Sequence, residues 1–285
     1  MKLSLLLENV RFEHTVFALP FAYLGMVLAA RGLPTWWQFT WITVAMVAAR
    51  TLAMSLNRVV DWRLDALNPR TARRPVPSGR LPAREVWLVA AASLGVLTLS
   101  AWMLNDLCVK LLPIAVVFLV GYHHTKRFTP LCHLILGITD GGAPVGGWVA
   151  VTGTLDWPAI WLGVAVAAWV AGFDLIYCCQ DVEFDRAHRL HSIAADVNVA
   201  TSLFVARACH VVTLAALAAV GLITGLGLLY WVGWAVAAGL LAYEHSLVSP
   251  TDLSRLDAAF FNVNGYLGLA VFAFTFAAVL LASRA

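Results

Sequence analysis

The sequence predicts an all-α, polytopic membrane protein with nine transmembrane helices in one bundle. Of its 285 residues, 61% are hydrophobic and 12% are charged, whereas about a quarter of the residues in a soluble domain are charged. The mean hydropathy is +0.81. The apolar residues form runs of roughly 20, the length that an α-helix needs to cross a bilayer, and not the short alternating segments of a β-barrel.

Nine apolar runs define the expected helices. The first contains "FEHTVFALPFAYLGMVLAA", the second runs into the polar segment "NRVVDWRLD", and only "TGLG" separates the seventh from the eighth. After the second helix, the loop "DALNPRTARRPVPSGRLP" is rich in proline and cannot form one long helix, so a short helix or an ordered cap is expected there. The helices are expected at residues 15–31, 38–57, 85–104, 107–124, 131–151, 158–178, 202–224, 227–244 and 259–282.

The distribution of basic residues predicts the orientation. On one side of the membrane lie 15 of the 19 Lys and Arg residues, in the N-terminal tail or in and next to the loops after helices two, four, six and eight. Because cytoplasmic loops carry the excess of basic residues, the N-terminus and this loop face are expected in the cytoplasm, with the chain in a bacterial inner (plasma) membrane. The lipid bilayer is thus an expected partner and nucleic acid is not. The four exceptions are Arg31, Arg50, Lys110 and Arg284.

An internal repeat divides the chain at an offset of about 120 residues. Asp61 and Asp65 align with Asp181 and Asp185, and "YHHTKRFTP" aligns with "YEHSLVSP". Two repeats of four helices each, at about 15–124 and 131–244, would be parallel and would place both carboxylate pairs on one membrane face, whereas inverted repeats would separate them. Residues 1–285 are expected to form a single domain, with the helix at 259–282 outside the repeats.

Polar side chains recur every four residues where the second helix is expected to end. At 100° per residue, Asn57, Asp61 and Asp65 lie within an arc of about 80° on one helix face. One such stripe of polar residues along a helix face is as readily explained by a solvated helix end.

A second stripe favours a functional interpretation. Asp174, Asp181 and Asp185 are spaced by seven and four residues and lie within an arc of about 40°, with Tyr177 nearby. Two stripes in helical register, related by the repeat, indicate one site at the cytoplasmic end of the bundle.

The composition of the two stripes predicts a metal-bound polyanion. Carboxylate oxygens suit a hard cation, and Mg²⁺ typically binds one or two carboxylates together with substrate phosphates. Basic loops beside acidic stripes are consistent with a diphosphate held through Mg²⁺ and through direct Arg or Lys contacts. The basic residues in these loops are Arg63, Arg70, Arg73, Arg74, Lys126, Arg127, Arg186 and Arg189.

Two charged residues are expected deeper in the membrane. Arg50 lies seven residues before Asn57, and Asp174 lies seven before Asp181, so each should lie about 10 Å deeper than its stripe. Charged groups at this depth are costly and usually functional. A structural ion pair between Arg50 and Asp174 and a role in substrate binding are both open.

The whole chain resembles the UbiA superfamily of intramembrane aromatic prenyltransferases, from "FEHTVFALPFA" to "FFNVNGYLGLAVF". The segments "ARRPVPSG" and "YHHTKRFTPLCHLILG" are similar to the sequences that follow helices two and four in that family. The family motif N-x-x-x-D-x-x-x-D is matched by Asn57, Asp61 and Asp65. The motif D-x-x-Y-x-x-x-D-x-x-x-D is matched by Asp174, Tyr177, Asp181 and Asp185.

Shorter segments resemble one branch of this superfamily. "FALPFA", "QDVEFD", "LHSIAA" and "YEHSLVSP" are most similar to the 4-hydroxybenzoate polyprenyltransferase-like branch found with bacterial menaquinone synthesis. Two departures leave the number of metal ions open: Arg58 stands where many relatives have Asp, and "VEFD" replaces a fuller acidic run.

The resemblance implies transfer of a polyprenyl group from its diphosphate to the ring of a quinone precursor, of the 4-hydroxybenzoate or naphthoate type. It implies catalysis through Asp61, Asp65, Asp181 and Asp185, which hold Mg²⁺ with Asn57 as a further ligand. The expected diphosphate-binding residues are Lys126, Arg127, Arg73, Arg74 and Tyr177. The acceptor-binding candidates are Arg50, Asp174, Tyr122 and His123, and the candidates for the base that removes the ring proton are His123, His124 and Asp174.

Competing interpretations concern both the fifth helix and the whole chain. Gly141, Gly142, Gly146 and Gly147 either admit a prenyl tail or pack helices closely.

A transporter of an anion or a lipid phosphate is the alternative function from another class of protein, although paired carboxylates would repel a bare anion. Within the superfamily, the acceptor could instead be haem, chlorophyllide or a lipid. The sequence leaves the prenyl chain length and the oligomeric state open.

Overall fold

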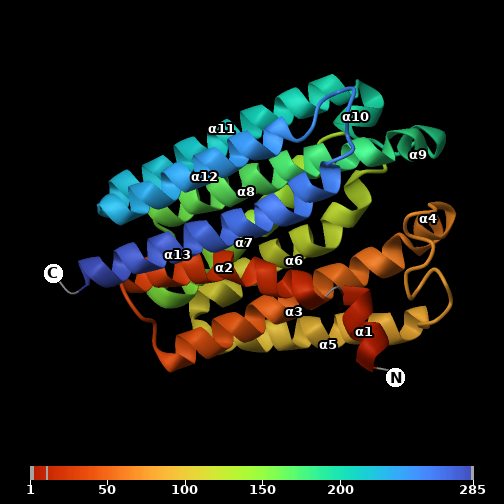
Figure 1. The fold of residues 1–285 in the computed structure, drawn as a ribbon. Coiled ribbons are helices and arrows are strands. Elements are labelled where there is room, and N and C mark those ends of the chain that lie inside the picture. Colours follow the sequence, from red (N-terminus) through yellow and green to blue (C-terminus); the bar gives the residue numbers. More distant parts are fainter. Residues whose placement is uncertain (1–2, 11, 284–285) are drawn as a thin grey trace.

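The computed structural model describes residues 3–10 and 12–283 as a helical bundle without strands in those ranges (Figure 1). The first half contains α1 (Leu3–Val10), α2 (Phe12–Ala30), α3 (Trp36–Val60), α4 (Trp62–Leu67), α5 (Ala83–Leu104) and α6 (Asp106–Thr125). The second half contains α7 (Cys132–Thr152), α8 (Trp157–Tyr177), a 3₁₀ turn (Cys178–Asp181), α9 (Val182–Ala187), α10 (Ile193–Asp196), α11 (Val199–Thr224), α12 (Leu228–Ser246), a π-helical turn (Ala258–Val263) and α13 (Asn264–Ala282).

Seven helical stretches of the described residues are long and apolar enough to cross a membrane. They contain α3, α5, α6, α7, α8, α11 and α13. Helices also stand at the two other predicted positions, as α2 and α12, but neither belongs to this set. The all-helical class is confirmed, and the count of nine spans stays a prediction.

Short polar segments set the helix ends. The side chain of Thr35 accepts a hydrogen bond from the Gln38 amide, and the Gln38 side chain accepts one from the Thr35 amide, so the two form a capping box before α3. Between α11 and α12, Gly225 has a φ of 66° and ends α11 in the left-handed conformation that glycine tolerates best. This turn lies in "TGLG", where the sequence predicted the break.

The core centres on α8, which packs against α7 on one side and α11 on the other. Its buried residues include Leu162, Val166 and Trp169. The helix pair α3 and α5 forms the opposite edge of the bundle, and Figure 1 shows α4 and α9 at one end, together with α1. The C-terminal end of α13 lies at the other end. The fold therefore brings the segments after α3 and α8 to the same end of the bundle.

Candidate active site

A cavity of about 620 Å³ lies at the end of the bundle where α3 and α8 terminate. It is lined by all four carboxylates of the predicted pairs: Asp61, Asp65, Asp181 and Asp185. The side chains reach it from segments that are 120 residues apart in sequence.

The helical path breaks near the first aspartate of each pair: α3 ends at Val60, just before Asp61, and α8 ends at Tyr177 and is followed by a 3₁₀ turn that closes at Asp181. Asp61 separates α3 from α4 with φ −98° and ψ 6°, and Asp181 precedes α9 with φ −102° and ψ 7°. The second helix was expected to end at residue 57, whereas α3 continues to Val60 and the break follows at Asp61. The Asp61 amide still donates to the Asn57 carbonyl and the Asp65 amide to the Asp61 carbonyl, so the four-residue spacing holds across the break and both aspartates line the cavity.

The carboxylate of Asp61 is held by two cations from the loop after α6. Lys126 Nζ lies 2.9 Å from one oxygen, and Arg127 Nη2 donates to the other at 2.6 Å. Arg127 also donates to the carbonyl of Val60, which fixes its guanidinium at the end of α3. The Asp61 side chain is only 3% exposed, so these partners stabilise a charge that water barely reaches.

Two arginines of the loop after α4 hold two further carboxylates. Arg70 donates to both oxygens of Asp181, at 2.7 and 3.3 Å, and to the hydroxyl of Tyr177 at 3.0 Å. Arg74 Nη1 contacts both oxygens of Asp65 at 2.8 and 2.9 Å. Burial lowers the pKa of Arg70, but the charge of Asp181 outweighs it, so the pKa lies above its ordinary value. Arg70 therefore stays protonated at neutral pH.

The structure separates the basic residues that the sequence grouped together. Arg70 and Arg74 line the cavity, whereas Arg73 is exposed and does not belong to the lining. The Arg73 carbonyl accepts instead from Arg80, which pairs with Glu8 of α1 at 2.7 Å. Spacing alone could not distinguish these neighbours, because the chain there forms consecutive turns and no helix. The expected cap is thus a short helix, α4, followed by turns.

The oxygen donors around the cavity suit a hard cation such as Mg²⁺. Among the described residues, no group of three or more His, Cys, Asp or Glu side chains could hold a metal ion by itself. Asp185 accepts from Ser192 at 3.4 Å and, in the described part of the chain, forms no ion pair. The donor set fits an ion that takes its remaining oxygens from a substrate phosphate.

Asn57 is oriented by its neighbour Arg58. Arg58 Nη1 donates to the Asn57 side-chain oxygen at 2.9 Å, and Arg58 Nε donates to the Asn9 carbonyl of α1 at 3.1 Å. The Asn57 amide nitrogen lies 3.4 Å from His123 Nδ1. The oxygen that would bind a metal is therefore engaged by Arg58.

Deeper in the bundle, Asp174 pairs with a residue that the sequence did not single out. His133 Nδ1 lies 2.7 Å from Asp174, and both line the cavity. No ion pair joins Arg50 to Asp174 in the described part of the molecule, so that hypothesis is wrong. Arg50 Nε is buried there without a hydrogen-bond partner. The sequence could not predict His133 as a site residue, because a contact between α7 and α8 produces no regular spacing of residues along the chain.

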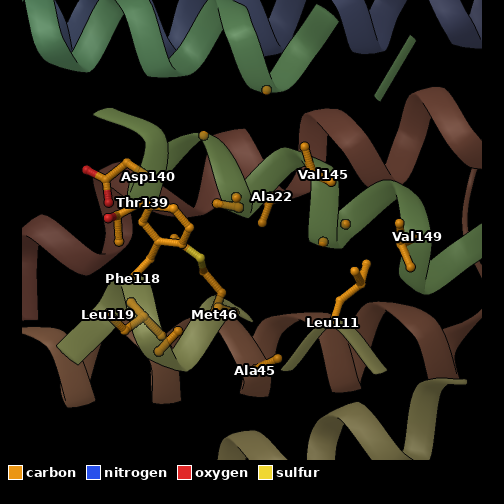
Figure 2. Close-up of a pocket in the computed structure, with 18 of the residues that line it drawn as sticks. Ala22, Ala45, Met46, Leu111, Phe118, Leu119, Thr139, Asp140, Val145 and Val149 are labelled. Atoms are coloured by element: carbon orange, nitrogen blue, oxygen red, sulfur yellow. The ribbon is translucent and has the colours of Figure 1, made fainter. Parts of the chain in front are cut away.

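A second cavity of about 550 Å³ adjoins the first and is almost entirely apolar (Figure 2). Met46, Phe118 and Leu119 lie near one end, close to Asp140, and Leu111 and Val149 lie toward the other (Figure 2). Arg50, Tyr122 and Asp140 line both cavities. These three residues form a polar boundary between the first cavity, the charged chamber, and the second, apolar cavity. Asp140 is a further polar residue that the sequence did not single out.

The four glycines of α7 divide into two pairs. A Cβ atom at Gly141 or Gly147 would collide with the carbonyls of Gly163 and Ala22, so these glycines allow close helix packing. A Cβ at Gly142 or Gly146 would meet no described atom within 4 Å, and both line the apolar cavity. The packing interpretation therefore holds for Gly141 and Gly147, and room for a prenyl tail beside Gly142 and Gly146 stays a prediction.

Comparisons with known proteins agree with this geometry. A family model described as the UbiA prenyltransferase family matches residues 18–266. The chain is 31% identical over 250 residues to a 4-hydroxybenzoate octaprenyltransferase of Nitrosospira multiformis, covering 87% of this chain and 85% of that protein. It is 34% identical over 251 residues to the 4-hydroxybenzoate octaprenyltransferase of Herminiimonas arsenicoxydans, covering 86% of each.

Two solved structures share the fold. The apo structure of a UbiA homologue from Aeropyrum pernix K1 has a TM-score of 0.85 at 33% identity and covers 96% of this chain and 98% of its own. A UbiA homologue from Archaeoglobus fulgidus, bound to DMAPP and Mg²⁺, has a TM-score of 0.74 at 17% identity and covers 97% of this chain and 99% of its own. The second likeness concerns the fold alone.

Proposed function

The chain belongs to the UbiA prenyltransferase family and is a prenyltransferase, and we propose that it transfers a polyprenyl group from a polyprenyl diphosphate to the ring of 4-hydroxybenzoate. One observation carries the proposal: four carboxylates from two interrupted helices line one cavity together with Arg70, Arg74 and Lys126. The names of the relatives support hydroxybenzoate as the acceptor. A naphthoate of menaquinone synthesis is the competing acceptor.

The charged chamber would bind the diphosphate. Lys126, Arg70 and Arg74 line this chamber and end in N–H groups beside the carboxylates, so they can donate to phosphate oxygens there. Arg127 does not line the chamber and would act by holding Asp61. Tyr177 would orient Arg70 through its hydroxyl. Arg73 lies outside this chamber and receives no role.

Asp61, Asp65, Asp181 and Asp185 would hold Mg²⁺ in this chamber. The bound ion supplies positive charge that stabilises the leaving diphosphate. Arg58 uses one lone pair of the Asn57 oxygen, so Asn57 would join the metal ligands through the other, while its amide nitrogen would orient His123. Since each carboxylate except Asp185 is already paired with a cation, the basic residues keep the acidic cluster stable before substrates bind.

The polar boundary would bind the acceptor. Arg50 has a buried Nε without a partner in the described residues, and it lies between the two cavities with Tyr122 and Asp140. A guanidinium there can bind the carboxylate of hydroxybenzoate. His123 and Asp174 line the same wall, and the base that removes the ring proton is to be sought among these side chains.

The apolar cavity would hold part of the prenyl tail. Its lining from α3, α6 and α7 excludes charged groups beyond the polar boundary. Such an enclosure also keeps water away from the allylic cation that forms as the C–O bond breaks.

The remaining architectural features belong to the same proposal. Nine spans would form two parallel repeats and an extra helix, which the matching backbone angles at Asp61 and Asp181 support. The basic residues beside the charged chamber favour a cytoplasmic location for that end in a bacterial inner membrane.

A direct assay tests the function. Purified protein in detergent is incubated with Mg²⁺, a polyprenyl diphosphate and either 4-hydroxybenzoate or a dihydroxynaphthoate, and the products are identified by mass spectrometry. The proposal predicts a prenylated hydroxybenzoate as the main product. A prenylated naphthoate alone would transfer the assignment to the competing acceptor, and consumption of neither acceptor would contradict it. Membership of an enzyme family leaves the transporter alternative without support.

A further inference from the structure

A fully buried carboxylate lies in the second half of the bundle, outside the lining of either cavity. Glu244 of α12 has no exposed surface, and it belongs to the segment "YEHSLVSP", to which the proposed mechanism gives no role. One of its oxygens accepts from the Asn264 side chain at 2.7 Å. The other has no hydrogen-bond partner in the described residues, with His210 Nδ1 3.6 Å away. A buried acidic group with an unpartnered oxygen is costly, which points to a role other than stability.

Asn264 connects Glu244 to the wall of the charged chamber. It lines that cavity and begins α13, directly after the π-helical turn Ala258–Val263. Its Oδ1 accepts from the indole of Trp169 at 2.6 Å, and Trp can only donate, so the orientation of the amide is determined. Its Nδ2 donates to Glu244.

The same amide stabilises the π turn. One N–H of Asn264 Nδ2 points to Glu244, and the other is shared between the carbonyls of Ala259 and Phe260, at 3.2 and 3.0 Å. A π turn disturbs the regular hydrogen-bond ladder and is frequent at functional sites. Glu244 thus fixes Asn264, and Asn264 fixes the backbone of Phe260.

Phe260 transmits this position to the diphosphate end. Its ring stacks on Tyr177, with centroids 4.0 Å apart and planes at 26°, and meets Phe173 edge to face at 5.3 Å. Tyr177 accepts from Arg70, whose guanidinium also lies 5.4 Å from the Tyr177 ring centroid. Arg70 in turn binds both oxygens of Asp181.

We propose that Glu244 is a positioning residue for the prenyl-diphosphate site, acting through Asn264, Phe260 and Tyr177 on Arg70 and Asp181. The inference rests on the proposed function for the identity of the substrate. Its physical content is that a buried carboxylate holds the π turn in the one position where Phe260 supports the Tyr177 ring.

The test compares two substitutions of similar size. Glu244→Gln keeps an oxygen that accepts from Asn264, whereas Glu244→Leu removes the acceptor. Glu244→Leu is expected to raise the KM for prenyl diphosphate about tenfold, equivalent to ~1.4 kcal/mol, and to leave the KM for the acceptor and the Tm nearly unchanged. Glu244→Gln should remain within about twofold of the unmodified protein. Tyr230→Phe, which removes a buried hydrogen bond at the other end of α12, is the matched control and should change neither KM.

Two further measurements separate positioning from general packing. The Kd of Mg²⁺-geranyl diphosphate, measured by calorimetry, should rise with the KM in Glu244→Leu. In a double-mutant cycle, Glu244→Leu should add little to Arg70→Ala, because both act on one assembly.

Two results would overturn the inference, and a third concerns the proposed function alone. Full additivity with Arg70→Ala, or equal changes in both KM values with a lower Tm, would overturn the inference and leave Glu244 a packing residue. If the unmodified protein binds geranyl diphosphate but prenylates neither acceptor, the proposed function fails while the binding comparison still decides the role of Glu244.

Discussion

The guanidinium of Arg127 lies 2.6 Å from the carboxylate of Asp61, a side chain that is 3% exposed at the end of α3. Lys126 contacts the other oxygen of the same carboxylate. A single buried acidic group thus connects the loop after α6 to the break between α3 and α4. This relationship predicts how the basic loop affects the two substrates.

Replacing Lys126 and Arg127 together by Ala should weaken binding of prenyl diphosphate far more than binding of the acceptor. The loss of Lys126 removes a charged hydrogen bond to phosphate, which contributes about 1.5–3 kcal/mol, and the loss of Arg127 releases Asp61. The KM for prenyl diphosphate is therefore expected to rise by about 100-fold. Steady-state kinetics with each substrate varied in turn measure both values. Equal losses for both substrates would contradict the assignment of this loop to the diphosphate.

Arg50→Met should weaken binding of the acceptor selectively. Met retains much of the apolar stem and removes the guanidinium, so the KM for 4-hydroxybenzoate is expected to rise about 30-fold, from the loss of ~2 kcal/mol. Phenol lacks the carboxylate and serves as the control acceptor, whose weaker turnover should be unaffected. A comparable loss with phenol would show that Arg50 shapes the cavity and does not bind the carboxylate.

The two glycine pairs of α7 should respond oppositely to substitution. Gly146→Leu adds a side chain to the apolar cavity and is expected to shorten the longest prenyl chain that the enzyme accepts, with little change in Tm. Gly147→Ala adds a Cβ against the Ala22 carbonyl and should destabilise the fold by about 1–3 kcal/mol. Thermal unfolding and mass spectrometry of products formed from prenyl diphosphates of several lengths measure both effects. Unchanged chain-length preference in Gly146→Leu would argue against a prenyl tail in this cavity.

Local spacing predicted the features that lie along single helices. Asp61, Asp65, Asp181 and Asp185 recur at helical intervals and at the repeat offset, so their convergence on one end could be inferred without a structure. The helix breaks at Asp61 and Asp181 could not, because the helical spacing of polar residues is the same on either side of a break.

Contacts between helices account for what the sequence did not predict. His133 meets Asp174 from α7, and Glu244 meets Asn264 from α12, and in each case the partner is set by how two helices pack. The choice of Arg70 over Arg73 depends on consecutive turns after α4, where neither helical nor strand periodicity applies. Such pairings require tertiary structure, since either residue alone resembles many polar residues at a helix end.

The central claim is that the two carboxylate groups act as one assembly, and a double-mutant cycle on Asp61→Asn and Asp181→Asn tests it most directly. Both substitutions preserve size, and the cations that they leave unpaired, Arg70, Lys126 and Arg127, are about one-third exposed to solvent. The protein is therefore expected to insert and unfold at a similar temperature. Each should lower Mg²⁺-dependent turnover by about 10³, because metal-borne stabilisation of the leaving group contributes several kcal/mol, and the pair together should lower it little further. A folded single variant with near-normal Mg²⁺-dependent turnover, or two losses that simply add, would contradict the claim.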